Sequence, residues 1–241
     1  MRATVSYGSF NTLLVDGAYD SGTFGPDKKS ELSIDVHRMT SDGYETYNAQ
    51  ERDAGSLKYE YKFSPNTTLT GFAGVVDLVA STPNGGPTRG QIAQFGDNFL
   101  LNNNPASPFY YKYNSYHVPT DFEYGDLNSH LGHGWNVEVK PYTYSYYNGQ
   151  YYEKNLTALG STSAIDKLNS YRKFGETSTV SQVSKWGVFR AGFWYEWAYT
   201  NRFQIPSNPL TRVDASLPNF HENYDTNTYQ PFAGIECPAL V

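Results

Sequence analysis

Hydrophobic and polar residues alternate along much of the chain with a period of two. In the segment 186–203, the odd-numbered positions from Phe189 to Tyr199 carry only aromatic residues and Ala, whereas the even-numbered positions include Arg190 and Glu196. This is the period of a β-strand with two unlike faces. At about 3.3 Å per residue, about fourteen residues would span roughly 45 Å. A strand of this length is far longer than the strands of about five or six residues that are usual in soluble domains.

The same alternation predicts several further strands. Their apolar rows are Val5, Tyr7, Leu13, Val15 and Tyr19; Leu32, Ile34 and Val36; Leu57, Tyr59, Tyr61 and Phe63; Val118, Phe122 and Tyr124; and Trp135, Val137 and Val139. The opposite rows carry most of the charge: Asp16 and Asp20; Glu31, Asp35 and His37; Lys58, Glu60 and Lys62; His117, Asp121 and Glu123; and Glu138 and Lys140. The segment after Thr67 and the segments 178–183 and 226–235 are also plausible strands. Together these patterns predict about nine strands.

The connections between the predicted strands alternate in length. Turn-forming residues fill the short connections 22–29, 64–67, 131–134 and 184–185. The intervening connections are long: 40–54, 81–115, 148–170 and 205–225. One of them contains a helix candidate, 88–101, with Ile92, Phe95 and Phe99 at helical spacing. A soluble sandwich has no reason to keep this order, whereas outer-membrane β-barrels have short periplasmic turns and long external loops.

These two patterns give a hypothesis for what the strands contact. The uncharged row of each strand faces lipid, and the charged row faces a wet lumen. A Lys or Arg on the lipid side near the midplane would cost about 2–4 kcal/mol. Arg190, Glu196, Lys58, Glu60, Lys62, Glu138 and Lys140 all fall in the opposite row. The cluster Tyr142, Tyr144, Tyr146 and Tyr147 precedes a long loop, as an interfacial aromatic girdle would.

Composition narrows the class of protein. The 241 residues include 22 Tyr, and aromatic residues make up 17% of the chain, whereas mean hydropathy is −0.60. Net charge is −6 and no basic run occurs, which argues against a nucleic-acid partner. One cysteine, Cys237, excludes an internal disulfide framework and a cysteine-based zinc site. The sequence has no apolar run long enough for a membrane helix and no signal peptide pattern, so we expect the chain to be part of a longer exported protein.

The chain shows no strong catalytic motif, and we expect neither an enzyme nor a bound cofactor or metal. His130 and His133 lie in a turn-like segment without a third ligand nearby. The carboxylate pairs Asp121–Glu123 and Asp16–Asp20 are better explained as lumen-lining charge than as a glycosidase pair. Aromatic residues of the loop 108–117, together with Arg89, are candidate ligand contacts, although loop packing explains the aromatic residues equally well: Arg89, Tyr110, Tyr111, Tyr113 and Tyr116.

Several short motifs resemble one known family. The run "TVSYGSFNT", then "SDGY", "TPNGGPTRGQIAQFGDNF", "TDFEY", "GHGW" and "GFWYEWAYTNRFQ" is similar to the barrel of TonB-dependent outer-membrane receptors, closest to the ferric-siderophore-receptor-like group, over residues 2–234. The resemblance implies a bacterial outer-membrane location and a plugged barrel of 22 strands. It also implies TonB-coupled uptake of a ferric siderophore or a similar large ligand, in which the ferric chelate is cargo and not a cofactor.

The chain departs from that family in two respects. The plug and the segment that contacts TonB are not matched, so TonB would act only through a plug segment missing here. The predicted strands also make only part of such a barrel. We therefore expect an all-β, antiparallel up-and-down transmembrane β-barrel portion over residues 2–236, an atypical tail over 237–241, and no transport by this portion alone. The alternatives are a small self-contained outer-membrane porin-like barrel and a soluble aromatic-rich glycan-binding or hydrolase β domain.

Overall fold

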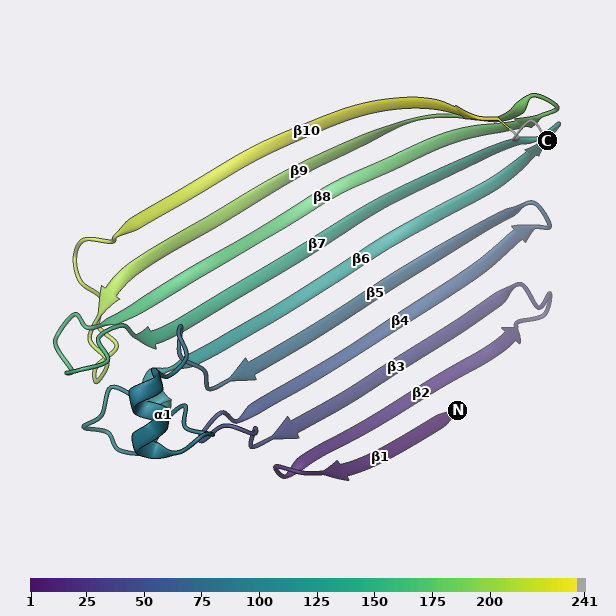
Figure 1. Cartoon of the computed structure of the whole chain (residues 1–241). Coiled ribbons are helices and arrows are strands. Elements are labelled where there is room, and N and C mark those ends of the chain that lie inside the picture. The colour runs from purple at the N-terminus through teal and green to yellow at the C-terminus, as the bar shows by residue number, and fades with distance from the viewer. Residues whose placement is uncertain (238–241) are drawn as a thin grey trace.

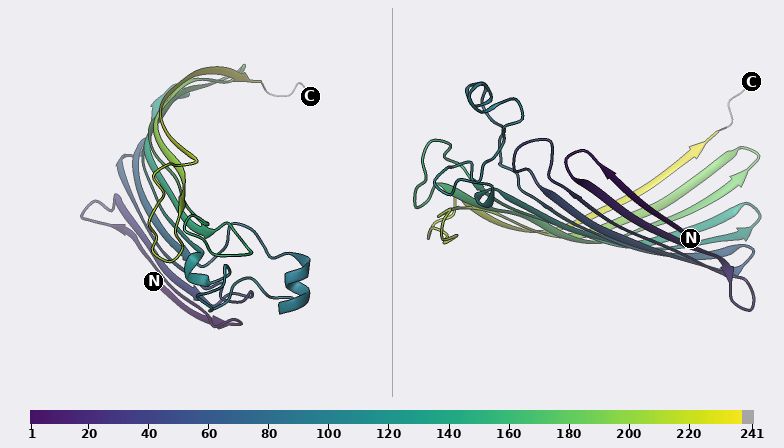
Figure 2. Two further views of the ribbon diagram at one scale, coloured as in Figure 1. Left: turned by 90° about the vertical axis from the view of Figure 1, so that its left-hand side faces the viewer. Right: turned by 90° about the horizontal axis from the view of Figure 1, so that it is seen from below.

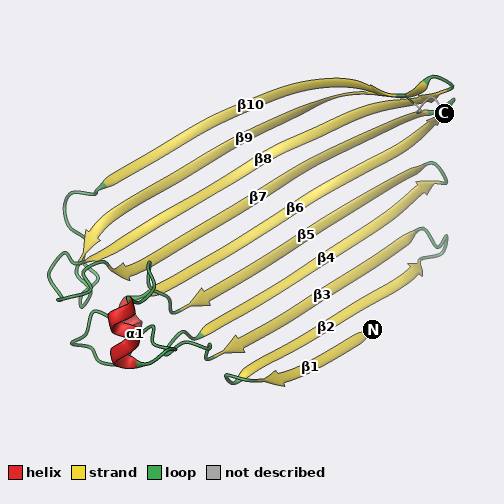
Figure 3. Cartoon of the chain, viewed as in Figure 1, coloured by secondary structure: helices red, strands yellow, loops and turns green. Residues whose placement is uncertain are grey.

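The computed structural model describes residues 1–237 and contains one antiparallel sheet of ten strands (Figures 1 and 3). Each strand pairs with the next along the chain, so the sheet order is β1 to β10 without a crossover. The strands are β1 (Arg2–Gly8), β2 (Thr12–Phe24), β3 (Ser30–Ser41), β4 (Gln50–Ser64), β5 (Thr67–Ala80), β6 (Ser115–Gly132), β7 (Trp135–Glu153), β8 (Ala164–Ser184), β9 (Gly187–Ser207) and β10 (Phe220–Glu236).

The sheet is a single curved layer (Figure 2). β1 pairs only with β2, and β10 only with β9, so the sheet is open within the described residues. No second sheet covers either face over residues 1–237. The second packed apolar face that a soluble sandwich would require is therefore not found in residues 1–237.

Side-chain exposure distinguishes the two faces of the curved sheet. Along β5, Leu69, Val75 and Val79 are exposed, at 37%, 56% and 46%. The interleaved Phe72 and Val76 are less exposed and are half-buried. Side chains crowd together on the inside of a curved sheet and spread apart on its outside. We therefore call the face of Val75 the convex face and the face of Val76 the concave face. Directly paired residues on neighbouring strands share a face, so the register assigns the rest of the sheet.

The register confirms most of the predicted faces. The uncharged row from Phe189 to Tyr199 on β9 is on the convex face. So are the predicted apolar rows of β1 to β4 that begin at Val5, Leu32 and Leu57. Seven of the charged residues predicted for the opposite rows are on the concave face: Lys58, Glu60, Lys62, Glu138, Lys140, Arg190 and Glu196.

Residues 117–124 of β6 do not have their uncharged row on the convex face. Phe122 pairs with Gly74 and Tyr124 with Phe72, so these two aromatic residues are on the concave face. Asp121 pairs with Val75 and is on the convex face, as are Glu123 and His117. The prediction that the uncharged row faces outwards on every strand is wrong here. The prediction that Asp121 and Glu123 line the lumen is wrong for the same reason.

The connections confirm the predicted order of short turns and long loops from β2 onwards. The turns 25–29, 65–66, 133–134 and 185–186 lie at one end, which we call the short-turn end. The loops 42–49, 81–114, 154–163 and 208–219 lie at the other, which we call the long-loop end (Figure 1). Gly132, His133 and Gly134 all have positive φ values, which confirms a tight turn at His133, whereas His130 lies in β6 and pairs with Asn136.

Two differences from the sequence prediction concern strand boundaries. Residues 2–24 form a hairpin rather than one strand, because Phe10 and Asn11 take positive φ values of 59° and 55° and Thr12 N–H donates to Ser9 O. The sheet therefore has ten strands and not about nine. Three of the long loops are shorter than predicted, because β3, β4 and β7 to β10 continue past the alternating segments. Backbone pairing extends these strands where side-chain alternation no longer marks them.

The predicted helix is present but shorter than the expected 88–101: α1 (Arg89–Phe95) lies within the loop 81–114, and Phe99 lies beyond its end. Thr88 and Gln91 form a capping box, in which each side chain bonds to the other residue's backbone N–H, and Gly96 ends the helix at φ 105°. A 3₁₀ turn, η1 (Tyr111–Tyr113), precedes β6. No helix in the described part of the chain is both long and apolar enough to cross a membrane.

Candidate functional site

The convex face carries a belt without basic residues next to the short-turn end. Over about nine residues of each strand from that end, the outward-facing positions of the described chain hold no Lys, Asp or His, and Arg38 and Glu176 lie at the upper margin. About nine residues at about 3.3 Å each and a tilt of about 40° rise roughly 23 Å, close to the 25 Å apolar band of outer-membrane barrels. Exposed belt residues include Tyr19, Val36, Leu57, Tyr59, Leu69, Leu127, Trp135, Val180, Phe189, Phe193, Tyr229 and Ile235.

Charged residues appear on the convex face immediately above the belt. Arg38 bonds to Glu51 and, at 2.9 Å, to Asp53. Arg172 holds Asp121 through two hydrogen bonds, of 2.6 and 3.2 Å. The outer surface therefore changes from apolar to charged at a common level along the sheet, as expected where a barrel wall leaves hydrocarbon for water.

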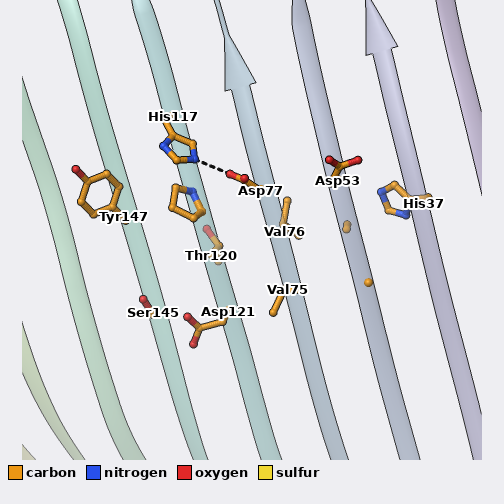
Figure 4. A pocket seen from close by; sticks show the side chains of 13 residues that line it. His37, Asp53, Val75, Val76, Asp77, His117, Thr120, Asp121, Ser145 and Tyr147 are labelled. Atoms are coloured by element: carbon orange, nitrogen blue, oxygen red, sulfur yellow. Dashed lines mark hydrogen bonds and ion pairs between the residues drawn. The ribbon is translucent and has the colours of Figure 1, made fainter.

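A groove lies at this boundary (Figure 4). Its volume is about 850 Å³, and small residues of four neighbouring strands line it, including Gly55, Val75, Pro119 and Ser145. Asp53, Asp77, His117, Asp121 and Tyr147 border it.

The concave face carries a hydrogen-bonded network at mid-height. Lys173 Nζ lies 2.9 Å from Glu196 Oε1, and the hydroxyl of Tyr142 donates to Glu196 Oε2 at 2.7 Å. The indole of Trp194 donates to the same hydroxyl at 2.9 Å. Gly175 lies beneath the ring of Tyr142, where a Cβ would overlap the ring. These contacts join β7, β8 and β9 and hold the Glu196 carboxylate on the concave face.

Tyrosines form a second cluster on the concave face, closer to the long-loop end. Tyr146 stacks on Tyr171 with ring centroids 5.2 Å apart, and Tyr144 lies 5.7 Å from the same ring. Of the four tyrosines predicted to form an outer girdle, only Tyr147 is on the convex face. The girdle prediction is wrong for Tyr142, Tyr144 and Tyr146 because strand parity points them inwards.

A small buried core orders the long-loop end. Phe99, Leu100 and Leu101 are almost fully buried, and Thr46 of the neighbouring loop accepts from Leu100 N–H and donates to Leu101 O. Asn114 is 1% exposed and donates to the carbonyls of Pro108 and Tyr110, while its side-chain oxygen accepts from the backbone N–H of the last β7 residue. The loops therefore form a packed platform above the sheet.

Two ionisable groups of this platform have shifted pKa values. Burial raises the pKa of Tyr113, whose hydroxyl donates to Pro105 O at 2.8 Å. Burial also raises the pKa of Glu153, the last residue of β7, although hydrogen bonds from Ser163 and from the Asn155 N–H oppose the shift. Both groups belong to the packing of the loops.

Arg212 joins two loops that are far apart in the sequence. Its guanidinium lies over the ring of Tyr151 at 4.6 Å and donates to Lys112 O at 2.9 Å. The hydroxyl of Tyr151 in turn donates to Asn208 O at 2.7 Å. No sequence motif marked Arg212, since the contact spans 100 residues.

The structure separates the predicted ligand contacts into three positions. Tyr110 packs edge to face against both Tyr111 and Tyr113 around η1, and Tyr113 is 5% exposed. Tyr116 is on the concave face near the start of β6, where it pairs with Ala80 of β5 and Gln150 of β7. Arg89 is exposed on the first turn of α1. Tyr116 is thus the tyrosine of this set that lies on the inner wall. Over residues 1–237, no three His, Cys, Asp or Glu side chains are grouped to hold a metal ion.

Solved structures share this architecture. The ferric citrate transporter FecA in its unliganded form aligns with a TM-score of 0.68 and 14% identity over 96% of this chain and 33% of that one. The FpvAI–pyocin S2 complex aligns with a TM-score of 0.72 and 10% identity over 96% and 34%. The ferripyoverdine receptor of the outer membrane of Pseudomonas aeruginosa, bound to ferripyoverdine, aligns with a TM-score of 0.62 and 11% identity over 96% and 34%.

The chain has the fold of the barrel wall of outer-membrane ferric-siderophore receptors. The resemblance expected from the sequence is confirmed at this level, and the chain spans about a third of the length of these structures. The sequence itself matches no protein-family model and no curated protein. The matched structures are transporters or receptors and not enzymes.

Proposed function

We propose that this chain forms part of the barrel wall of a bacterial outer-membrane receptor that imports a ferric siderophore or a similarly large ligand in a TonB-coupled manner. The observation that carries the proposal is the pairing of a belt without basic residues on the convex face with a charged, tyrosine-rich concave face. A wall between hydrocarbon and a wet lumen needs this asymmetry, and a soluble domain does not. The fold shared with ferric citrate and ferripyoverdine receptors supports the same class of cargo.

The proposal assigns roles to the two ends of the sheet. The long-loop end is external and provides the first contacts with ligand, and the short-turn end is periplasmic. Tyr116 and the neighbouring concave tyrosines are the proposed inner-wall contacts, and Arg89, Tyr110 and Tyr111 the proposed loop contacts. Tyr113 supports the loop because its ring is buried. TonB coupling would act through a plug, and the chain works as a wall and not as an enzyme.

Neighbouring residues of β9 offer a direct test. Two single-tryptophan proteins are compared in bilayers containing lipids brominated on the acyl chain: one carries Phe193→Trp with all four native tryptophans replaced by Phe, and the other retains only Trp194. Phe193 is on the convex belt and Trp194 on the concave face. We expect strong bromine quenching in the first protein and weak quenching in the second. Equal quenching of the two, or absence of the folded chain from bilayers, would refute the proposal.

A second experiment tests the cargo. Ferric citrate and ferripyoverdine are the natural probes, because the matched receptors bear their names. We expect binding of a ferric chelate, measured by quenching of intrinsic fluorescence, to weaken in Tyr116→Ala. Tyr229→Ala on the convex face is the matched control and should bind as the unmodified chain does. If neither chelate binds, ferric citrate and ferripyoverdine are excluded as cargo. The assignment of the chain to a barrel wall is tested separately, by the bromine-quenching experiment.

A further inference from the structure

Aromatic side chains form a continuous strip on the concave face from β5 to β8. Phe72 stacks on Tyr124 with ring centroids 5.3 Å apart. Phe122 lies 5.7 Å from Tyr124 and 6.2 Å from Tyr144, and the strip continues from Tyr144 to Tyr171 at 5.7 Å. These spacings are within the range of about 4.5–7 Å that is usual for interacting rings. The strip lies on the face that the proposed function assigns to the wet lumen, so contact with lipid does not explain it.

One end of the strip borders a niche between β3 and β6. The niche has a volume of about 290 Å³, and Phe72 and Phe122 are among the residues that line it. Phe122 is 39% exposed although it is on the concave face. The Phe72 ring lies over Gly74, where a Cβ would be only 3.1 Å from the ring, so the missing side chain leaves room for it. A space of this size holds one aromatic ring, since benzene fits an apolar cavity of about 150 Å³.

The same niche contains an arginine without an acidic partner. Arg52 is half-buried near the long-loop end of β4 and lines the niche. Over residues 1–237, the other basic residues of the strands are either paired with a carboxylate or, for Lys167, hydrogen-bonded to Gln150. Asp35 is the acidic residue of the niche, and Nδ1 of His37 lies 3.7 Å from its carboxylate. The niche therefore places an unpaired guanidinium next to two aromatic rings.

We propose that this niche binds an aromatic group that carries an anionic oxygen, an aryl carboxylate or a phenolate, and that the cargo of the receptor contains such a group. The inference rests on the proposed function, since it needs the concave face to line the path of the cargo. The ring of the ligand packs against Phe72 and Phe122, and its anionic oxygen accepts from the Arg52 guanidinium. Citrate has no ring for this wall, and its additional carboxylates meet Asp35. The niche therefore favours aryl chelates over citrate chelates.

Binding of single-ring probes to the full chain in detergent measures this preference. Salicylate supplies a ring with a carboxylate, salicyl alcohol supplies the same ring without the charge, and citrate supplies carboxylates without a ring. Dissociation constants are obtained from saturation-transfer NMR titrations, with protein-free micelles as the blank. We expect salicylate to bind about fivefold more tightly than salicyl alcohol, the ratio that one exposed ion pair of about 1 kcal/mol supplies. Citrate at the same concentration should not displace it.

Substitutions in the niche and a matched control assign the binding to this site. Phe122→Ala removes the exposed ring and should weaken salicylate binding about fivefold, as loss of one aromatic contact of about 1 kcal/mol does. Phe174→Ala, on the convex face of β8, is the control and should bind salicylate as the unmodified chain does. Arg52→Gln breaks no ion pair of the fold and should lower the affinity for salicylate to that for salicyl alcohol. Arg52→Lys should retain a preference for salicylate.

The outcomes are distinct from those of the proposed function. Equal affinity of the unmodified chain for salicylate and salicyl alcohol, displacement of salicylate by citrate, or identical affinities in Phe122→Ala and Phe174→Ala would overturn the aryl-anion site while bromine quenching still placed the belt in the bilayer. Lack of quenching at the belt would overturn the wall assignment and, with it, the assignment of the aryl group to the cargo.

Discussion

Trp194 and Trp197 are three residues apart on β9 and point to opposite faces of one sheet. The Trp194 indole donates to the Tyr142 hydroxyl on the concave face, whereas the Trp197 ring stacks on Phe174 on the convex face with centroids 5.7 Å apart. One indole is thus held in a polar network and the other forms part of an outer aromatic surface. This division within one strand is the basis for the predictions that follow.

A lysine introduced at the height of the belt should destabilise the protein on the convex face and not on the concave face. Val180, on the convex face of β8, is 39% exposed near the middle of the belt, and its neighbour Thr179 is on the concave face opposite Glu138. We expect Val180→Lys to lower the free energy of unfolding in bilayers by about 2–4 kcal/mol and Thr179→Lys to change it little. Denaturant titration of both variants in lipid vesicles measures this, and equal effects would contradict a lipid-facing belt.

Gly175 should be needed for the position of Tyr142. A methyl group at residue 175 would overlap the Tyr142 ring and displace its hydroxyl from Glu196. We expect Gly175→Ala to cost about 1–3 kcal/mol, as overpacking does. Gly234→Ala on β10, where nothing lies within 4 Å, is the control and should be close to neutral. The measurement is the difference in unfolding free energy, and a neutral Gly175→Ala would show that Tyr142 relocates freely.

The contact between Lys173 and Glu196 should give a measurable coupling energy. Their side chains are 34% and 13% exposed, so water screens the pair only in part. In a double-mutant cycle with Lys173→Met and Glu196→Gln, we expect a coupling of about 1 kcal/mol, which decreases at high salt. Lys58 and Glu60, 3.9 Å apart and more exposed, provide a comparison pair that should couple less strongly. Equal coupling in the two pairs would contradict the effect of burial.

Arg212 should hold the loop 208–219 against the neighbouring loop. Removing its guanidinium in Arg212→Ala takes away both the contact with Tyr151 and the bond to Lys112 O. We expect faster amide hydrogen exchange in residues 208–219 and unchanged exchange in β8 and β9. Arg190→Ala, an exposed residue at the short-turn end, is the control and should leave the loop unaffected. Unchanged exchange in Arg212→Ala would show that other contacts order the loop.

Period-two alternation alone was enough to place the faces of most strands. It works for the row from Phe189 to Tyr199 and for Lys58, Glu60 and Lys62, because within the belt the two environments differ sharply. It failed for Phe122 and Tyr124, at the upper margin of the belt. There the aromatic residues of β6 pack against Phe72 on the concave face while Asp121 and Glu123 are on the convex face, so side-chain type no longer reports orientation.

The chain by itself determined the class of fold, the two ends of the sheet and helix α1, because alternation, turn residues and capping residues are local signals. Only the tertiary structure decided that residues 2–24 make a hairpin, that Tyr142, Tyr144 and Tyr146 point inwards, and that Arg212 reaches Lys112. Each of these depends on strand register or on contacts between distant segments. Register sets which face every side chain occupies, and a one-residue difference in a strand reverses it, so no local pattern can supply that information.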